Sequence, residues 1–150
     1  MATVGRMELR PGLTNVVPGE AVIRTDLRNI DGEGLAATQE RLIAFLHEAA
    51  AEEEGCAAEW RPLARFAPTP FDAGLVDLIE RSAQDLGHSV KRMPSGAGHD
   101  AQMFAPNCPS AMIFVPSKDG ISHNTNEYTS PEDIEAGGNV LLRVLLETAE

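Results

Sequence analysis

An apolar run in the second half of the chain, residues 110–115, constrains the fold more strongly than any other segment. It is short and uncharged, which favours one buried strand. A histidine-containing loop lies on each side of it: Ser-Gly-Ala-Gly-His-Asp at residues 95–100 and Gly-Ile-Ser-His-Asn at residues 120–124. Loops that flank the strands of an open α/β sheet commonly carry chemistry. His99 and His123 are therefore the first candidates for a functional site.

Composition limits the kinds of partner. The chain has 150 residues, 43% of them hydrophobic, and a formal net charge of -11. This acidity argues against nucleic acids and anionic membranes. No segment approaches the roughly 20 apolar residues of a membrane span, and the first residues lack the apolar core of a signal peptide. Cys56 and Cys108 lie far apart without a Cys-x-x-Cys motif, so we interpret them as reduced thiols of a cytoplasmic protein.

The first part of the chain, residues 1–67, predicts a small layer of strands and one helix. Strands are expected over residues 4–9 and 20–28, a helix over residues 35–54, and a third strand over residues 57–66. The second strand alternates, which indicates a sheet covered on one side. Its mostly apolar face consists of Ala21, Ile23, Thr25 and Leu27.

The second part, residues 68–150, begins at the turn Pro-Thr-Pro and predicts alternating helices and strands. Helices are expected over residues 72–86 and 101–104, and strands over residues 89–93 and 110–115. The alternation favours an α/β layer, so the predicted class is α/β, with an α+β first part followed by an α/β second part.

The last helix has a clear start. Ser130 is a typical N-cap, Pro131 suits the first helical position, and Asp133 is placed to help the cap. An apolar stripe follows, formed by Ile134, Leu141, Leu142, Leu145 and Leu146.

His123 is a candidate metal ligand. Imidazole binds zinc, manganese or cobalt in its neutral form, and its second nitrogen needs an orienting partner. The alternative is a histidine that only stabilises its loop. Glu127 could orient such a ligand, or it could simply accept a hydrogen bond from the loop.

His99 follows a glycine-rich turn. Gly96 and Gly98 allow backbone N–H groups to approach an anion closely. The alternative is that the glycines only make a turn and that Asp100 caps the helix after them.

Arg28 ends the second strand on its charged face. A guanidinium there can hold a carboxylate through two hydrogen bonds, and Asn15 could donate to the same carboxylate. The alternatives are an arginine paired with Asp26 or a nearby acid, and an asparagine that shapes a turn.

A family resemblance rests on motifs spread over nearly the whole sequence. They occupy residues 3–6, 14–19, 26–28, 94–101, 114–117, 120–124 and 127–133. In order and content these segments resemble the amidase/hydantoinase/carbamoylase branch of the M20 metallopeptidase-like hydrolases. That branch includes N-carbamoyl-L-amino-acid hydrolase, β-ureidopropionase and allantoate amidohydrolase. The resemblance implies that residues 1–67 are part of a lid and dimerisation domain, and that residues 68–150 are the C-terminal segment of a catalytic domain.

The resemblance also implies roles for the candidates. His123 matches the last histidine of a dinuclear metal site. Arg28 and Asn15 match residues that hold the substrate carboxylate, and Gly98 matches a backbone donor near it. His99 matches a histidine that contacts the ureido or amide group, and we expect it to be catalytic. In such a site two divalent metal ions, zinc, manganese or cobalt, polarise the carbonyl and activate a water.

This sequence departs from the family pattern in length. Family enzymes carry an N-terminal portion with the other metal ligands and the catalytic base, and none of those motifs is present here. We therefore expect the C-terminal part of an amidohydrolase that cleaves linear C–N bonds of N-carbamoyl amino acids or related ureido acids. Alone it is expected to be inactive and to bind no metal. Its expected partners are a second copy through the lid or the N-terminal portion. The alternative is a non-catalytic module for carboxylate binding or assembly.

Overall fold

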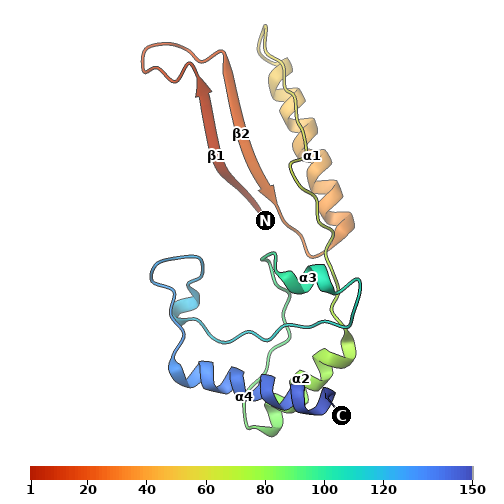
Figure 1. Cartoon of the computed structure of the whole chain (residues 1–150). Coiled ribbons are helices and arrows are strands. Elements are labelled where there is room, and N and C mark those ends of the chain that lie inside the picture. Colours follow the sequence, from red (N-terminus) through yellow and green to blue (C-terminus); the bar gives the residue numbers. More distant parts are fainter. Residues whose placement is uncertain (150) are drawn as a thin grey trace. The chain divides into compact units, whose positions relative to one another are not determined.

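A computed structural model describes residues 1–149 (Figure 1). The chain divides into two units, Met1–Pro68 and Thr69–Glu150. This division lies one residue beyond the predicted one. Within residues 1–149, no helix has both the length and the apolar character needed to cross a membrane.

The first unit begins with a two-stranded antiparallel hairpin. β1 (Ala2–Arg10) pairs with β2 (Glu20–Leu27), from Ala2 opposite Leu27 to Arg10 opposite Glu20. The two strands predicted here are confirmed, with ends shifted by one or two residues. The connecting loop lies at one end of the hairpin (Figure 1).

A β-bulge in β1 keeps its apolar residues on one face. Val4 pairs with Thr25 and Arg6 pairs with Arg24, so Gly5 is the extra residue. Since one extra residue shifts the alternation by one position, Val4 and Met7 share a face although they are three residues apart. The opposite face of the hairpin carries the charged residues. The bulge therefore reconciles an irregular sequence pattern with a two-faced sheet.

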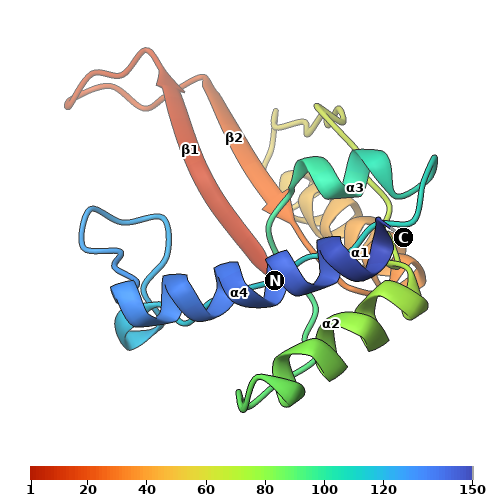
Figure 2. The same cartoon turned by 60° about the horizontal axis from the view of Figure 1, so that its bottom comes forward.

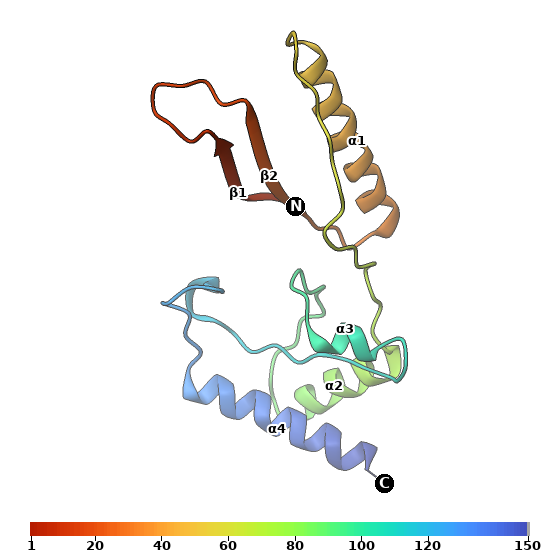
Figure 3. The same cartoon turned by 45° about the horizontal axis from the view of Figure 1, so that its top comes forward.

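Helix α1 (Gly32–Ala51) follows β2 and lies beside it (Figure 3). Its N-cap is Asp31, whose carboxylate accepts hydrogen bonds from the N–H groups of Glu33 and Gly34 at 3.3 and 2.7 Å. This cap explains why the helix begins three residues before its predicted start. Gly55, in a left-handed conformation with φ of 81°, follows the end of the helix.

Three predicted strands are wrong. The structure has no regular secondary structure over residues 57–66, 89–93 and 110–115. A strand needs a neighbour that satisfies its N–H and C=O groups, and residues 1–149 offer these segments no paired strand. The run at 110–115 is also not buried as predicted, because Phe114 is 55% exposed.

The second unit is built around two packed helices, α2 (Ala73–Asp85) and α4 (Pro131–Thr148), shown in Figure 2. Between them in sequence lie the short helix α3 (Asp100–Phe104) and the single 3₁₀ turn η1 (Lys118–Gly120). Among residues 1–149, the buried side chains all lie on α2 and α4: Ser82, Ala83, Val140 and Val144.

Side-chain and backbone caps define the ends of these helices. Ser130 Oγ accepts a hydrogen bond from the Asp133 N–H at 3.1 Å, which confirms the predicted N-cap of α4. At the end of α2, the N–H of Gly87 bonds to Gln84 and that of His88 bonds to Ala83. With Gly87 at φ of 82°, this is a Schellman motif, as expected of a glycine that stops a helix.

The predicted apolar stripe of α4 is not the face that packs inside this chain. Val140 and Val144 are buried, whereas the stripe residues are each about half exposed. The apolar arc of α4 is wider than the contact that α2 offers. The exposed stripe consists of Ile134, Leu141, Leu142, Leu145 and Leu146.

Candidate functional site

The loop around His99 is ordered by local hydrogen bonds. Ser95 Oγ accepts from the Ala97 N–H at 3.2 Å and so closes a turn. His99 is the N-cap of α3, and its Nδ1 accepts from the Ala101 N–H at 3.1 Å. The predicted alternative of a cap by Asp100 is therefore wrong by one residue. Asp100 lies in the first turn of α3, where a carboxylate favours the positive end of the helix dipole.

The loop around His123 is closed at its base by a backbone hydrogen bond of 2.8 Å from Lys118 N–H to the Tyr128 carbonyl. His123 is exposed and has a φ of 56°, the left-handed conformation that is uncommon outside glycine. A Glu127 carboxylate oxygen accepts from the His123 N–H at 2.7 Å. Of the two predicted roles of Glu127, this contact matches the simpler one, a hydrogen bond to the loop.

Arg28 lies directly after β2 and is paired with Asp26. Its Nε and Nη2 atoms donate to Asp26 Oδ2 at 3.0 and 2.6 Å. These hydrogen bonds, with a smaller Coulombic contribution, hold the pKa of Asp26 below its usual value and raise the pKa of Arg28. Both side chains are about half exposed. The arrangement shows that the guanidinium fork is already turned towards a carboxylate at the surface.

Asn15 lies in a turn of the loop that joins β1 to β2. That loop precedes β2, and Arg28 follows it, so the two residues lie at opposite ends of the hairpin (Figure 1). Eight strand residues span about 26 Å. One small carboxylate therefore cannot contact Asn15 and Arg28 of the same hairpin in this conformation.

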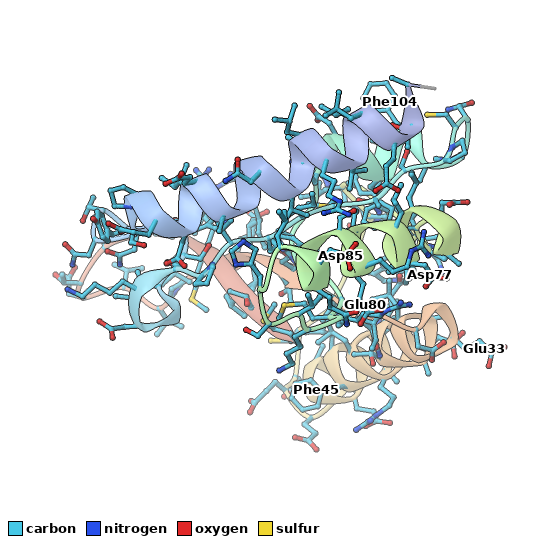
Figure 4. The ribbon with its side chains drawn as sticks, turned by 90° about the horizontal axis from the view of Figure 1, so that it is seen from below. Glu33, Phe45, Asp77, Glu80, Asp85 and Phe104 are labelled. Carbon is cyan, nitrogen blue, oxygen red and sulfur yellow. The ribbon has the colours of Figure 1, made fainter. Side chains whose placement is uncertain are left out.

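A cluster of charges that sequence reasoning missed anchors the segment before the glycine-rich turn. Arg92 donates to Asp77 at 2.7 Å and to Glu80 at 2.9 Å. Both acids lie on α2 and are labelled in Figure 4. The hydrogen bonds to Glu80 and then Asp77 raise the pKa of Arg92. The available signal was the pair of acids three residues apart, which places both on one side of a helix.

The described residues do not complete a metal site. Over residues 1–149, no three His, Cys, Asp or Glu side chains come together in a way that could hold an ion. A zinc site requires about three or four ligands. His123 would supply one ligand. The other residues of this chain that the structure describes do not complete the site around it. His99 and His123 lie in the second unit, and Asn15 and Arg28 lie in the first.

Comparison with known proteins identifies the family. The sequence pattern of Peptidase family M20/M25/M40 matches residues 2–147. The chain belongs to this family. An uncharacterized hydrolase from Haemophilus influenzae is 41% identical to the M20 chain over 150 residues, which are 100% of the chain and 36% of that protein. An N-carbamoyl-L-amino-acid amidohydrolase from Rhizobium meliloti is 37% identical over 147 residues, 98% of the chain and 35% of that enzyme.

Solved structures agree. An amidase of the hydantoinase/carbamoylase family from Burkholderia vietnamiensis matches 98% of the M20 chain with a TM-score of 0.91 and 39% identity, over 35% of its own length. AtUAH in complex with glyoxylate matches with a TM-score of 0.91 and 31% identity, over 98% of the chain and 35% of its own. The predicted resemblance and the α/β class are confirmed. The M20 chain spans little more than a third of the length of these relatives.

Proposed function

We propose that this chain supplies the substrate-holding residues and one metal ligand of a metal-dependent amidohydrolase. Its substrates would be N-carbamoyl amino acids or related ureido acids with a free carboxylate. The similarity to an N-carbamoyl-L-amino-acid amidohydrolase over 98% of the chain carries this proposal. The chain matches only 35% of that enzyme, so the remaining metal ligands and the base would lie outside residues 1–149. Residues 1–150 alone would then be inactive.

Arg28 would bind the carboxylate. A guanidinium fork can make two parallel hydrogen bonds to a carboxylate, which fixes orientation as well as position. Asp26 Oδ2 now receives hydrogen bonds from two nitrogens of that fork, and this contact supports the proposal that Arg28 binds carboxylates. A substrate carboxylate would share the Arg28 guanidinium with Asp26 or displace Asp26 from it. This contact would position the scissile bond of the substrate.

Asn15 would reach the carboxylate from a second copy of the chain. The geometry of the hairpin keeps Asn15 and Arg28 of one copy at opposite ends. The exposed apolar side chains of the hairpin favour association through this unit: Val4, Met7, Leu9 and Ile23 are 45–59% exposed. This arrangement agrees with the expected homo-oligomer and needs two chains for one complete carboxylate site.

In the second unit, the Gly98 N–H group would donate to the substrate carboxylate, and His99 would contact the ureido or amide group. The backbone near Gly98 is open, because a Cβ placed there would meet nothing within 4 Å. His123 would be one ligand of a divalent ion, zinc, manganese or cobalt, whose role when bound is to polarise the carbonyl and activate water. Within this chain, His123 would provide an imidazole from a loop that is held by the hydrogen bond from its own N–H to the Glu127 carboxylate.

The alternative is a non-catalytic module that binds small carboxylates or mediates assembly. The exposed Arg28 fork is the observation that favours it. Turnover separates the two, because both readings allow Arg28 to bind a carboxylate. Heat from N-carbamoylglycine at millimolar concentration, lost in Arg28→Gln, supports the module if a folded, metal-loaded chimera of this chain with a full-length relative shows no turnover. Turnover by that chimera supports the amidohydrolase.

The decisive experiment is a chimera. This chain replaces the matching 35% of the Rhizobium meliloti enzyme, and turnover of N-carbamoyl amino acids is measured with added Zn²⁺, Mn²⁺ or Co²⁺. We expect turnover by the chimera and none by residues 1–150 alone. Arg28→Gln in the chimera should raise KM strongly, and His123→Ala should abolish turnover. A folded, metal-loaded chimera without turnover, or turnover by the chain alone, would overturn the proposal.

A further inference from the structure

The two ring nitrogens of His99 have different environments. Nδ1 accepts a hydrogen bond from the Ala101 N–H at 3.1 Å. The His99 carbonyl accepts from the Gln102 N–H at 2.9 Å, and the backbone of His99 is extended, with φ of -148° and ψ of 154°. This is the conformation of an N-cap residue, and Ala101 is at the second helical position, where N-cap side chains find a donor. Side chain and main chain together hold the imidazole against the start of α3.

A ring nitrogen that accepts a hydrogen bond carries no proton. Neutral imidazole has a single N–H, so the proton must then be on the other nitrogen. We infer that the cap of α3 fixes His99 in the Nε2–H tautomer, so that the imidazole presents a hydrogen-bond donor, and not an acceptor, to a ligand. Ala101, through its N–H group, is the positioning residue for this donor.

The neighbouring backbone offers a second donor. Among residues 1–149, the Gly98 N–H has no hydrogen-bond partner, whereas the Ala97 N–H is engaged by Ser95. Two consecutive residues therefore present N–H groups. Donors of this kind recognise an oxygen, such as a carbonyl or carboxylate oxygen, and leave an –NH₂ group unsatisfied. This last step rests on the proposed function: the group at His99 would be the ureido or amide oxygen of the substrate and not its terminal nitrogen.

The tautomer can be observed directly in this chain. We would label the histidines with ¹⁵N and record long-range ¹H–¹⁵N correlations, raising the pH until the spectra show neutral imidazole rings. His47 is the internal control, because it is exposed on α1 and accepts or donates no side-chain hydrogen bond within residues 1–149. We expect a single Nε2–H tautomer for His99 and averaged signals for His47. Averaged signals for both, or an Nδ1–H tautomer at His99, would overturn the inference.

Amide exchange at Ala101 gives a second readout. His99→Ala removes the acceptor, so the Ala101 amide should exchange about five-fold faster than in the parent. His99→Asn is the matched variant, because asparagine is a strong N-cap, and it should leave the exchange rate nearly unchanged. Equal rates in the parent and His99→Ala would show that Nδ1 is not held. Neither measurement needs a metal ion or a substrate, so an inactive chimera with a fixed tautomer would reject only the proposed function.

Discussion

The two units of the chain differ in the interactions that stabilise each of them internally. In Met1–Pro68 no side chain is buried, and order comes from the β1–β2 ladder and the Asp31 cap of α1. In Thr69–Glu150 a small core forms where α2 meets α4, with Val140 and Val144 5% and 7% exposed. An ion pair of 2.8 Å from Arg143 on α4 to Asp85 on α2 joins the same helices; Asp85 is labelled in Figure 4. Backbone and capping hydrogen bonds thus stabilise the first unit, and packing of buried side chains between helices stabilises the second.

The comparison shows how much covering surface each unit lacks. The chain exposes 11932 Å². A folded monomer of its mass exposes about 7400 Å², and even two separate domains of half that mass expose about 9000 Å². Exposed apolar side chains of the hairpin and of α4, such as Met7 and Leu142, contribute to this difference. We expect such faces to be covered by a second copy or by the other two thirds of a family-length protein.

The largest predicted effect tests the difference in packing. Val144→Ala should destabilise the second unit by about 2 kcal/mol, through lost burial and a residual cavity. Ile23→Ala is the matched change in the first unit. Since Ile23 is 46% exposed, it should cost less than about 0.5 kcal/mol. Urea unfolding followed through amide signals of each unit measures both. A cost at Ile23 as large as at Val144 would show that the hairpin is covered by association.

Two neighbouring glycines in α4 sharpen the picture of the second unit. A Cβ on Gly137 would overlap Cγ1 of Val115, whereas one on Gly138 would meet nothing within 4 Å. Gly137→Ala should cost about 2 kcal/mol from overpacking, partly offset by about 1 kcal/mol of helix propensity. Gly138→Ala should gain up to about 1 kcal/mol. Thermal unfolding of both variants measures the difference in stability. Equal stabilisation by the two substitutions would mean that α4 does not pack against Val115 at Gly137.

The sequence predicted helices better than strands, for a physical reason. The cap at Ser130 and the stop at Gly87 are local signals, and both are confirmed by local hydrogen bonds. The run at 110–115 has a strand-like composition, but a ladder needs a second segment, and residues 1–149 do not supply it. The same limit applies to the apolar stripe of α4, because periodicity marks an apolar face without naming what covers it.

The candidate site was predictable only residue by residue. The family motifs located Arg28, His99 and His123, and their roles stay predictions. Proximity was not predictable: the loop and strand lengths that separate Asn15 from Arg28 become informative only once β1 and β2 are seen to pair. Likewise, the choice of His99 over Asp100 as the cap of α3 depends on backbone angles that the sequence does not state.

A smaller effect concerns a polar atom in the core. Ser82 is 1% exposed, and its Oγ has no hydrogen-bond partner among residues 1–149. A buried unsatisfied hydroxyl is costly, so Ser82→Ala should stabilise the second unit by about 0.5–1 kcal/mol. Ser130→Ala is the contrasting control, because that hydroxyl caps α4 and its loss should destabilise by about 1 kcal/mol. Destabilisation by Ser82→Ala would reveal a partner, such as a bound water, for that hydroxyl.

The smallest effect lies at the surface of the first unit, where Arg28 lowers the pKa of Asp26. A carboxyl with a depressed pKa in the folded state stabilises that state above its ordinary pKa of about 3.9, and the contribution is lost as the pH falls through the lowered value. Because the pair is half exposed, the change in stability should be slight, and the ¹³Cγ titration of Asp26 is the sensitive measurement. Its midpoint should lie below the ordinary value in the parent and return to it in Arg28→Gln. Addition of N-carbamoylglycine to the chimera without added metal, so that the ligand is not cleaved, should raise the midpoint as well, since a substrate carboxylate bound to the guanidinium leaves Asp26 without its partner. An unchanged midpoint at saturating ligand would place the substrate carboxylate elsewhere than on Arg28.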